Sequence, residues 1–81
     1  MMKRIDGYEI VYVEWLDACA SAGWHSSRDI REGGLAKMKS IGFLVHRDSE
    51  TVIISSSKGV EDRFGDAMTI PRSAVTKIKI L

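Results

Sequence analysis

The most constraining feature of the sequence is the run from Tyr8 to Leu16, which is rich in β-branched and aromatic side chains and contains no glycine or proline. Such a run predicts a β-strand. Alternate residues from Val11 to Trp15 form one apolar face. The opposite face carries Ile10, Tyr12, Glu14 and Leu16. A strand that is apolar on both faces is either central in a closed barrel or covered by a partner.

The length of 81 residues gives apolar surface for one core, so one domain is predicted over residues 1–81. A core of this size contributes only about 3–5 kcal/mol, and small domains therefore draw on disulfides, metals or subunit contacts. Cys19 is the only cysteine, which excludes an intrachain disulfide, and two histidines without a cysteine cluster argue against structural zinc. We therefore expect a homo-oligomer with no metal and no cofactor.

A long connection and four further strands are predicted after the first strand. The β pattern is lost between Asp17 and Ala36. There, either Ser26 with Asp29 or Asp29 with Glu32 predicts the start of one helical turn, which Gly33 and Gly34 end. Apolar runs bounded by turn residues then predict strands at Met38–His46, Thr51–Ser57, Ala67–Ile70 and Val75–Leu81. The predicted fold class is all-β, a small five-stranded antiparallel barrel whose long first loop holds one helical turn.

Two residues predict local features of these strands. Gly42 interrupts an apolar run and indicates a β-bulge or a sharp bend. Pro71, the only proline, ends its strand because it has no backbone N–H to donate to the ladder. The segment Pro71–Ala74 then predicts one 3₁₀ turn before the last strand.

The order of five short strands, a long first loop, a central hairpin and a last pair joined by a tight turn with proline resembles the Sm-like small barrel. The runs Val13–Ala18, Ser40–Val45 and Ile70–Val75 resemble a group of short uncharacterised proteins of tailed bacteriophages. The first resemblance implies the barrel fold, and the second implies a phage origin. Neither implies an activity.

Charge and hydropathy narrow the function classes. A net charge of +1 argues against a general duplex-binding protein, which needs a strong positive field. No stretch approaches 18 apolar residues, and no apolar run of signal-peptide length follows the first basic residues. We expect a cytoplasmic protein without membrane contact, located in an infected bacterial host if it is phage-encoded.

No constellation of residues predicts catalysis, so we expect a protein that is not an enzyme. Cys19, flanked by alanines, is expected to be a small buried filler. His25 and His46 have no carboxylate or second histidine at ligand spacing. Asp62 and Asp66 lack the ordered acidic ligands of a calcium loop. No metal site is predicted.

Residues 23–28 carry the strongest ligand-binding chemistry, because they combine an indole, an imidazole, two hydroxyls and a guanidinium. These groups suit stacking on a base and hydrogen bonding to a phosphate. In the alternative interpretation, the indole plugs one end of the barrel and the polar groups only face water. The predicted ligand-binding residues, including three from later turns, are Trp24, His25, Ser26, Ser27, Arg28, Lys58, Arg72 and Ser73.

Four lysines alternate with other residues on two of the predicted strands. They indicate a basic stripe that fits a nucleic-acid backbone. Alternatively, they protect exposed strand edges against aggregation. The four residues are Lys37, Lys39, Lys77 and Lys79.

These observations predict a non-catalytic, homo-oligomeric phage-type binding protein. Its expected ligand is a nucleotide, for example a host antiviral defence signal, which it binds or sequesters at loops or subunit interfaces because a small barrel has no room inside. One alternative is an Sm-like nucleic-acid-binding module that uses the lysines. Another is a phage structural or adaptor protein that contacts only protein.

Overall fold

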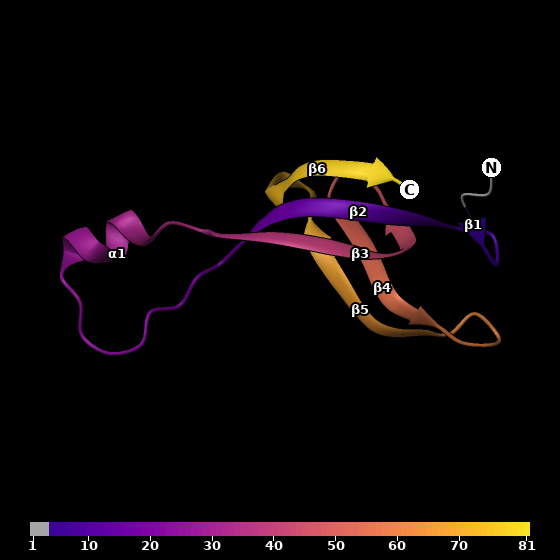
Figure 1. Cartoon of the computed structure of the whole chain (residues 1–81), viewed down its shortest axis with the longest axis horizontal. Coiled ribbons are helices and arrows are strands. Elements are labelled where there is room, and N and C mark those ends of the chain that lie inside the picture. The colour runs from indigo at the N-terminus through magenta and orange to yellow at the C-terminus, as the bar shows by residue number, and fades with distance from the viewer. Residues whose placement is uncertain (1–3) are drawn as a thin grey trace.

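The structure, a computed structural model, describes residues 4–81 and consists mainly of one antiparallel sheet (Figure 1). The predicted all-β class is confirmed. Residues 1–3, part of the predicted domain, lie outside the described residues. The elements are β1 (Arg4–Ile5), β2 (Tyr8–Asp17), α1 (Ser27–Gly33), β3 (Ala36–Arg47), β4 (Thr51–Lys58), β5 (Phe64–Pro71), the 3₁₀ helix η1 (Arg72–Ala74) and β6 (Val75–Ile80).

The sheet has six strands and is not closed, so the predicted five-stranded barrel is not confirmed. The strand order is β1-β2-β3-β4-β5, β6 also pairs with β2, and every pairing is antiparallel. Within residues 4–81, no ladder joins β5 to β6, which leaves both as edge strands.

The additional strand is β1, which pairs with the first residues of β2. Asp6 and Gly7 connect the two strands with φ angles of 52° and 83°. Two consecutive positive φ angles at an Asp-Gly pair are the signature of a tight hairpin turn. The sequence interpretation did not use this Asp-Gly turn and therefore missed β1.

The core lies on one face of the strongly curved sheet. Val11, Val13 and Trp15 of β2 are buried together, which confirms that they share one face and shows that this face is the core face. They pack with Val52, Ile54 and Ile70, and partly buried side chains complete the cluster. These partly buried residues are Leu44, Met68, Ala74, Val75 and Ile78.

Gly42 marks a close approach between β3 and β4. A Cβ atom at this position would lie 2.6 Å from the backbone oxygen of Ser55, so only glycine fits. The register shift in this ladder lies between Leu44 and His46, not at Gly42. Gly42 is therefore needed for close packing and does not form the predicted bulge or bend. The register shift comes two residues later, after Leu44.

Residues 18–35, here called the arm, connect β2 to β3 and extend away from the sheet (Figure 1). Every residue of the arm is exposed. The molecule measures 50 × 22 × 22 Å because the arm lengthens it along one axis. The predicted helical turn is confirmed as α1, with Ser26 as N-cap and Gly34 as C-cap. No side chain of this helix is buried.

The last connection agrees with the sequence interpretation. β5 ends at Pro71, η1 follows, and β6 returns to pair with β2. The Arg72 amide donates to the Glu50 carbonyl at 2.7 Å, which ties η1 to the turn between β3 and β4. Among the described residues, no helix is long and apolar enough to cross a membrane.

Candidate functional site

The strand register brings all four predicted lysines to one side of the sheet. Glu14 of β2 pairs with Lys39 of β3 and with Lys77 of β6. Directly paired residues share a face of the sheet, and Glu14 lies on the face opposite the core. Lys37 lies opposite Leu16. We call the surface formed by Lys37, Lys39, Lys77 and Lys79 around Glu14 the lysine face.

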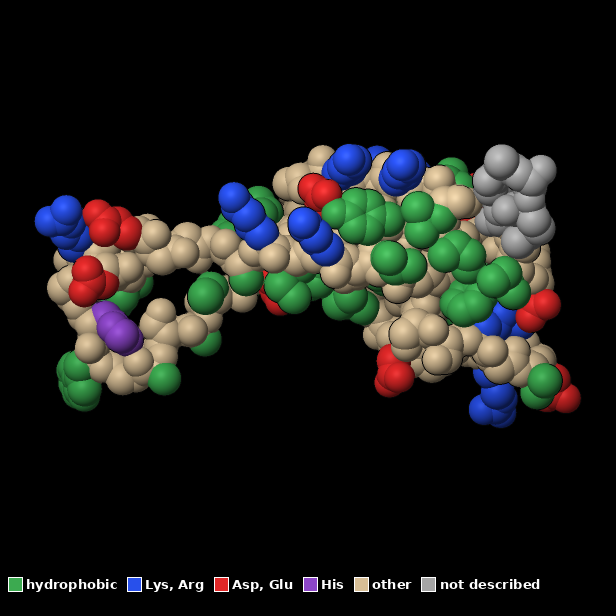
Figure 2. Space-filling view, in the orientation of Figure 1, with side chains coloured by type: hydrophobic (Ala, Val, Ile, Leu, Met, Phe, Trp, Pro, Cys, Tyr) green, Lys and Arg blue, Asp and Glu red, His purple; other side chains and the backbone are tan. Residues whose placement is uncertain are grey.

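The lysine face is exposed and positively charged. All four lysines are exposed, and Figure 2 shows Lys and Arg side chains gathered there around an acidic one. Within residues 4–81, none of the four ammonium groups has a hydrogen-bond or ion-pair partner. Four ammonium groups and one carboxylate leave a local excess of positive charge that favours an anion.

Tyr12 orients the single carboxylate of this surface. Its hydroxyl donates a hydrogen bond to Oε2 of Glu14, two residues along the same face of β2. This hydrogen bond, with a smaller effect of desolvation, raises the pKa of Tyr12 above its ordinary value. The tyrosine therefore remains a donor at neutral pH, and the carboxylate stays directed along the strand.

A pocket of about 280 Å³ opens beside the lysine face. It lies where the register between β2 and β6 shifts, between Glu14 and Trp15. At this shift, Oγ1 of Thr76 donates to the Glu14 carbonyl at 3.2 Å. The shift leaves Thr76 without a paired residue on β2, and Thr76 lines the recess together with residues of β2 and β3. The pocket is lined by Glu14, Trp15, Leu16, Lys37, Met38, Lys39 and Thr76.

An apolar surface continues from the lysine face along the same side of the sheet. Tyr12 pairs with Ile41, and Ile10 pairs with Phe43. The Leu81 amide donates to the Ile10 carbonyl at 2.8 Å, which brings the C-terminal residue beside them. Figure 2 shows hydrophobic side chains covering this area. We call the surface formed by Ile10, Tyr12, Ile41, Phe43 and Leu81 the apolar patch.

The loop predicted to bind a ligand is the tip of the arm, where most of its polar groups contact one another. His25 donates through Nε2 to the Ala22 carbonyl at 2.7 Å. Ser26 Oγ accepts from the Asp29 amide at 3.1 Å, as an N-cap does. Ser27 and Arg28 interact with the side chains of Arg31 and Glu32, one helical turn later. The polar side chains of residues 26–28 therefore stabilise the short helix α1.

Trp24 differs from its neighbours because its side chain is fully exposed. The alternative interpretation, in which it plugs the barrel, is therefore wrong. The buried indole belongs to Trp15, whose Nε1 donates to Ser40 Oγ at 3.0 Å. Trp24 is left as a free aromatic surface on the arm.

Lys58 lies at the opposite end of the molecule from the arm, among aromatic rings. Its Nζ is 3.6 Å from Asp6 Oδ2 and about 6 Å from the ring centroids of Tyr8 and Phe64. These two rings contact each other edge to face, 5.0 Å apart. The side chain of Lys58 therefore ties the β1–β2 turn to β5.

Arg72 and Ser73 lie in η1, apart from both the arm tip and Lys58. The structure thus distributes the predicted ligand-binding residues over three places in a single chain. It brings the four lysines together instead. The signal that joins the lysines is the pairing of β3 and β6 with the same strand, β2.

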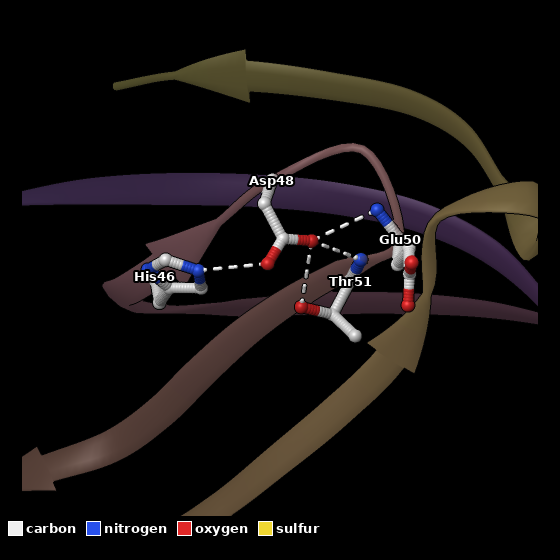
Figure 3. Close-up of polar contacts among 4 residues, drawn as sticks. All are labelled: His46, Asp48, Glu50 and Thr51. Carbon is white, nitrogen blue, oxygen red and sulfur yellow. Dashed lines mark hydrogen bonds and ion pairs between the residues drawn. The ribbon is translucent and has the colours of Figure 1, made fainter.

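A separate polar cluster caps the turn between β3 and β4 (Figure 3). Oδ1 of Asp48 accepts from the amides of Glu50 and Thr51 at 2.8 and 2.7 Å, and Oδ2 is 2.9 Å from His46 Nε2. The His46 contact, followed by the two amides, holds the pKa of Asp48 far below its usual range. These bonds are local to an exposed turn, so we assign the cluster to stability.

Two further expectations concern reactive groups. Cys19 is exposed on the arm, so the expectation of a small buried filler is wrong; it extends beyond the core like the rest of the arm. Within residues 4–81, no group of three or more His, Cys, Asp or Glu side chains is arranged to hold a metal ion.

Comparison with known protein families, with characterised proteins and with solved structures finds no match to this chain, and its function is therefore argued from its own residues.

Proposed function

We propose that this protein is a non-catalytic, homo-oligomeric binding protein that holds a phosphate-bearing, nucleotide-type ligand on the lysine face. One observation carries this proposal: the strand register gathers four unpartnered lysines beside a pocket of about 280 Å³. Ammonium groups bind phosphate oxygens through charge-assisted hydrogen bonds. The shape and the charge of the surface therefore favour the same class of ligand.

The size of the pocket supports a small ligand. Small-molecule sites commonly enclose about 300–1,000 Å³, and the recess beside Lys37 and Lys39, at about 280 Å³, lies just below that range. A mononucleotide or a dinucleotide would place its phosphate among the lysines.

Three features support self-association. β5 and β6 are both edge strands, and unpaired strand edges favour pairing with another chain. The chain has 81 residues and one cysteine, so neither a large core nor an intrachain disulfide stabilises it. The arm has no buried residue. A ligand bound at a subunit boundary would be enclosed more fully than on one open face.

The strand order supports an Sm-like relationship as part of this proposal. Five consecutive strands, β1 to β5, pair in sequence, and β6 returns through a 3₁₀ turn to pair with β2, the first long strand. Under this proposal the open sheet is an incompletely closed small barrel. A phage-encoded protein of this kind would act in the cytoplasm of an infected bacterium and sequester a host signalling nucleotide, which requires affinity but no turnover.

The spread of the lysines favours single-stranded nucleic acid as a second candidate ligand. From Lys37, opposite Leu16, to Lys79, opposite Tyr12, the lysine face extends four residues along β2, about 13 Å. It also extends across two strand spacings, about 10 Å. One phosphate cannot contact all four ammonium groups over this area, whereas the successive phosphates of a polymer can.

Titration of the purified protein with a panel of nucleotides and with short single-stranded oligonucleotides tests the proposal. The double variant Lys39→Ala/Lys77→Ala removes the two lysines beside Glu14, and we expect it to lose at least ten-fold in affinity, because each charge-assisted bond contributes about 1.5–3 kcal/mol. Arg63→Ala, an exposed cation on the β4–β5 loop, is the matched control. Equal affinity of the double variant and the parent for every ligand would overturn the proposal.

A further inference from the structure

The arm carries three large apolar side chains that are exposed in the single chain. Trp24 is fully exposed, and Ile30 and Leu35 are 58% and 59% exposed. Isolated helices shorter than about 12–15 residues are marginal in water, because helical stability comes mostly from packing. α1 has seven residues and buries none of them. Its own capping bonds and side-chain pairs are local, so the arm lacks the packing that a helix of this length requires.

The sheet has an uncovered surface of the same character. Ile41, at the centre of the apolar patch, is 63% exposed, although it lies in the middle of the long strand β3. Its neighbours on the patch include Tyr12 and Phe43, which contribute two aromatic rings. Contiguous exposed apolar side chains rimmed by charged ones mark interaction surfaces.

These two surfaces cannot meet within one chain in this structure. The arm leaves the sheet at the ends of β2 and β3 and continues along the long axis of the molecule, away from the patch (Figure 1). The molecule is 50 Å long and 22 Å across, and the arm forms one end of its long axis, where it is open to contact by a second copy. Each chain thus presents two uncovered apolar surfaces, the arm and the apolar patch.

We propose that the arm of a second copy docks on the apolar patch, and that two copies exchange arms reciprocally about a two-fold axis. Such an isologous contact covers both surfaces of both chains and leaves neither exposed. The inference deepens the self-association in the proposed function by naming the surfaces, and it does not depend on the ligand.

The charges on the two surfaces agree with this occupant. The carboxylate of Asp29 on α1 has no hydrogen-bond or ion-pair partner among the described residues, because its interaction with Ser26 is made by the backbone amide. The unpartnered lysines of the lysine face border the apolar patch. Arg28 of the same helix pairs with Glu32, and the charge of Asp29 balances that of Arg31. α1 therefore has no net charge, and it can dock beside the lysine face without net charge repulsion.

A mixing experiment tests the exchange. Trp24→Asp disables the arm and Ile41→Asp disables the patch, and both residues are exposed, so each variant is expected to keep the parent fold by circular dichroism. By light scattering at micromolar concentration, we expect the parent to be a dimer or larger and each variant alone to be a monomer. An equimolar mixture of the two variants retains one intact arm and one intact patch, and we expect it to form dimers.

Val60→Asp is the matched control, because Val60 is an exposed apolar residue in the β4–β5 loop, outside both surfaces. This variant should associate like the parent. Variants that stay oligomeric, or a mixture that stays monomeric, would overturn the arm exchange while leaving self-association through other surfaces in place. A monomeric parent would overturn both.

Discussion

Tyr12 donates a hydrogen bond to Glu14, two residues further along the outward face of β2. This pair lies at the junction between the apolar patch and the lysine face. The tyrosine ring belongs to the patch, and its hydroxyl fixes the only carboxylate among the four lysines. The pair thus separates a surface suited to apolar contact from a surface suited to anions.

Glu14→Gln removes the negative charge from the lysine face while keeping a side chain of the same shape. We expect tighter binding of phosphate ligands, by up to about fivefold, which corresponds to an exposed charge interaction of about 1 kcal/mol. Titration of the parent and the variant with the same nucleotide measures the change. Weaker binding by the variant would show that the ligand uses the carboxylate as an acceptor rather than avoiding its charge.

Gly42→Ala tests the close approach of β3 to β4. The added Cβ atom would lie 2.6 Å from the Ser55 carbonyl oxygen, which is backbone and cannot rotate away. We expect a loss of about 1–3 kcal/mol in the free energy of unfolding, measured by denaturant titration. Gly33→Ala is the control, because a Cβ atom at that helical position meets nothing within 4 Å. It should be neutral or stabilising by up to about 1 kcal/mol.

The alternation of residues in β2 correctly predicted that Val11, Val13 and Trp15 share one face, but both faces of the strand are apolar, so the sequence did not show which of them is buried in the core. Closure of the sheet could not be predicted from the pattern of any single strand, because it depends on whether β5 and β6 pair. The hairpin at Asp6-Gly7 could have been predicted from its turn residues. β1 itself has only two residues, too few for an alternating pattern.

The candidate site was predicted only in part. The four lysines were identified, yet their assembly around Glu14 depends on two ladders that join residues distant in the chain. The polar groups of residues 25–28 have suitable chemistry for a ligand, but local hydrogen bonds around α1 engage them. The composition of a loop shows which polar groups it contains, but it does not show which of them already form hydrogen bonds within the loop.

Asp48 predicts a specific dependence of stability on pH. Its folded pKa is lowered, so its contribution to stability is present above the ordinary carboxyl pKa of about 3.9 and is lost as the pH falls below that value toward the folded pKa. Asp48→Asn should lower the Tm at pH 7 and reduce the fall in Tm between pH 5 and pH 3. A variant whose fall in Tm over this range equals that of the parent would assign the acid sensitivity to other carboxylates.

The salt dependence of binding separates the two candidate ligands of the lysine face. For single strands, log K falls with log salt with a slope of about −0.7 per phosphate contact, so four lysine contacts give about −2.8. Raising the salt from about 50 to about 200 mM should then weaken binding of an oligonucleotide about 50-fold. Lys39→Ala/Lys77→Ala leaves two contacts and a slope of about −1.4, which reduces the loss to about sevenfold. Arg63→Ala should keep the parent slope. A parent that binds mononucleotides tightly with a shallow slope would favour the enclosed small ligand, and a steep slope shared by parent and double variant would move the phosphate contacts away from the lysine face.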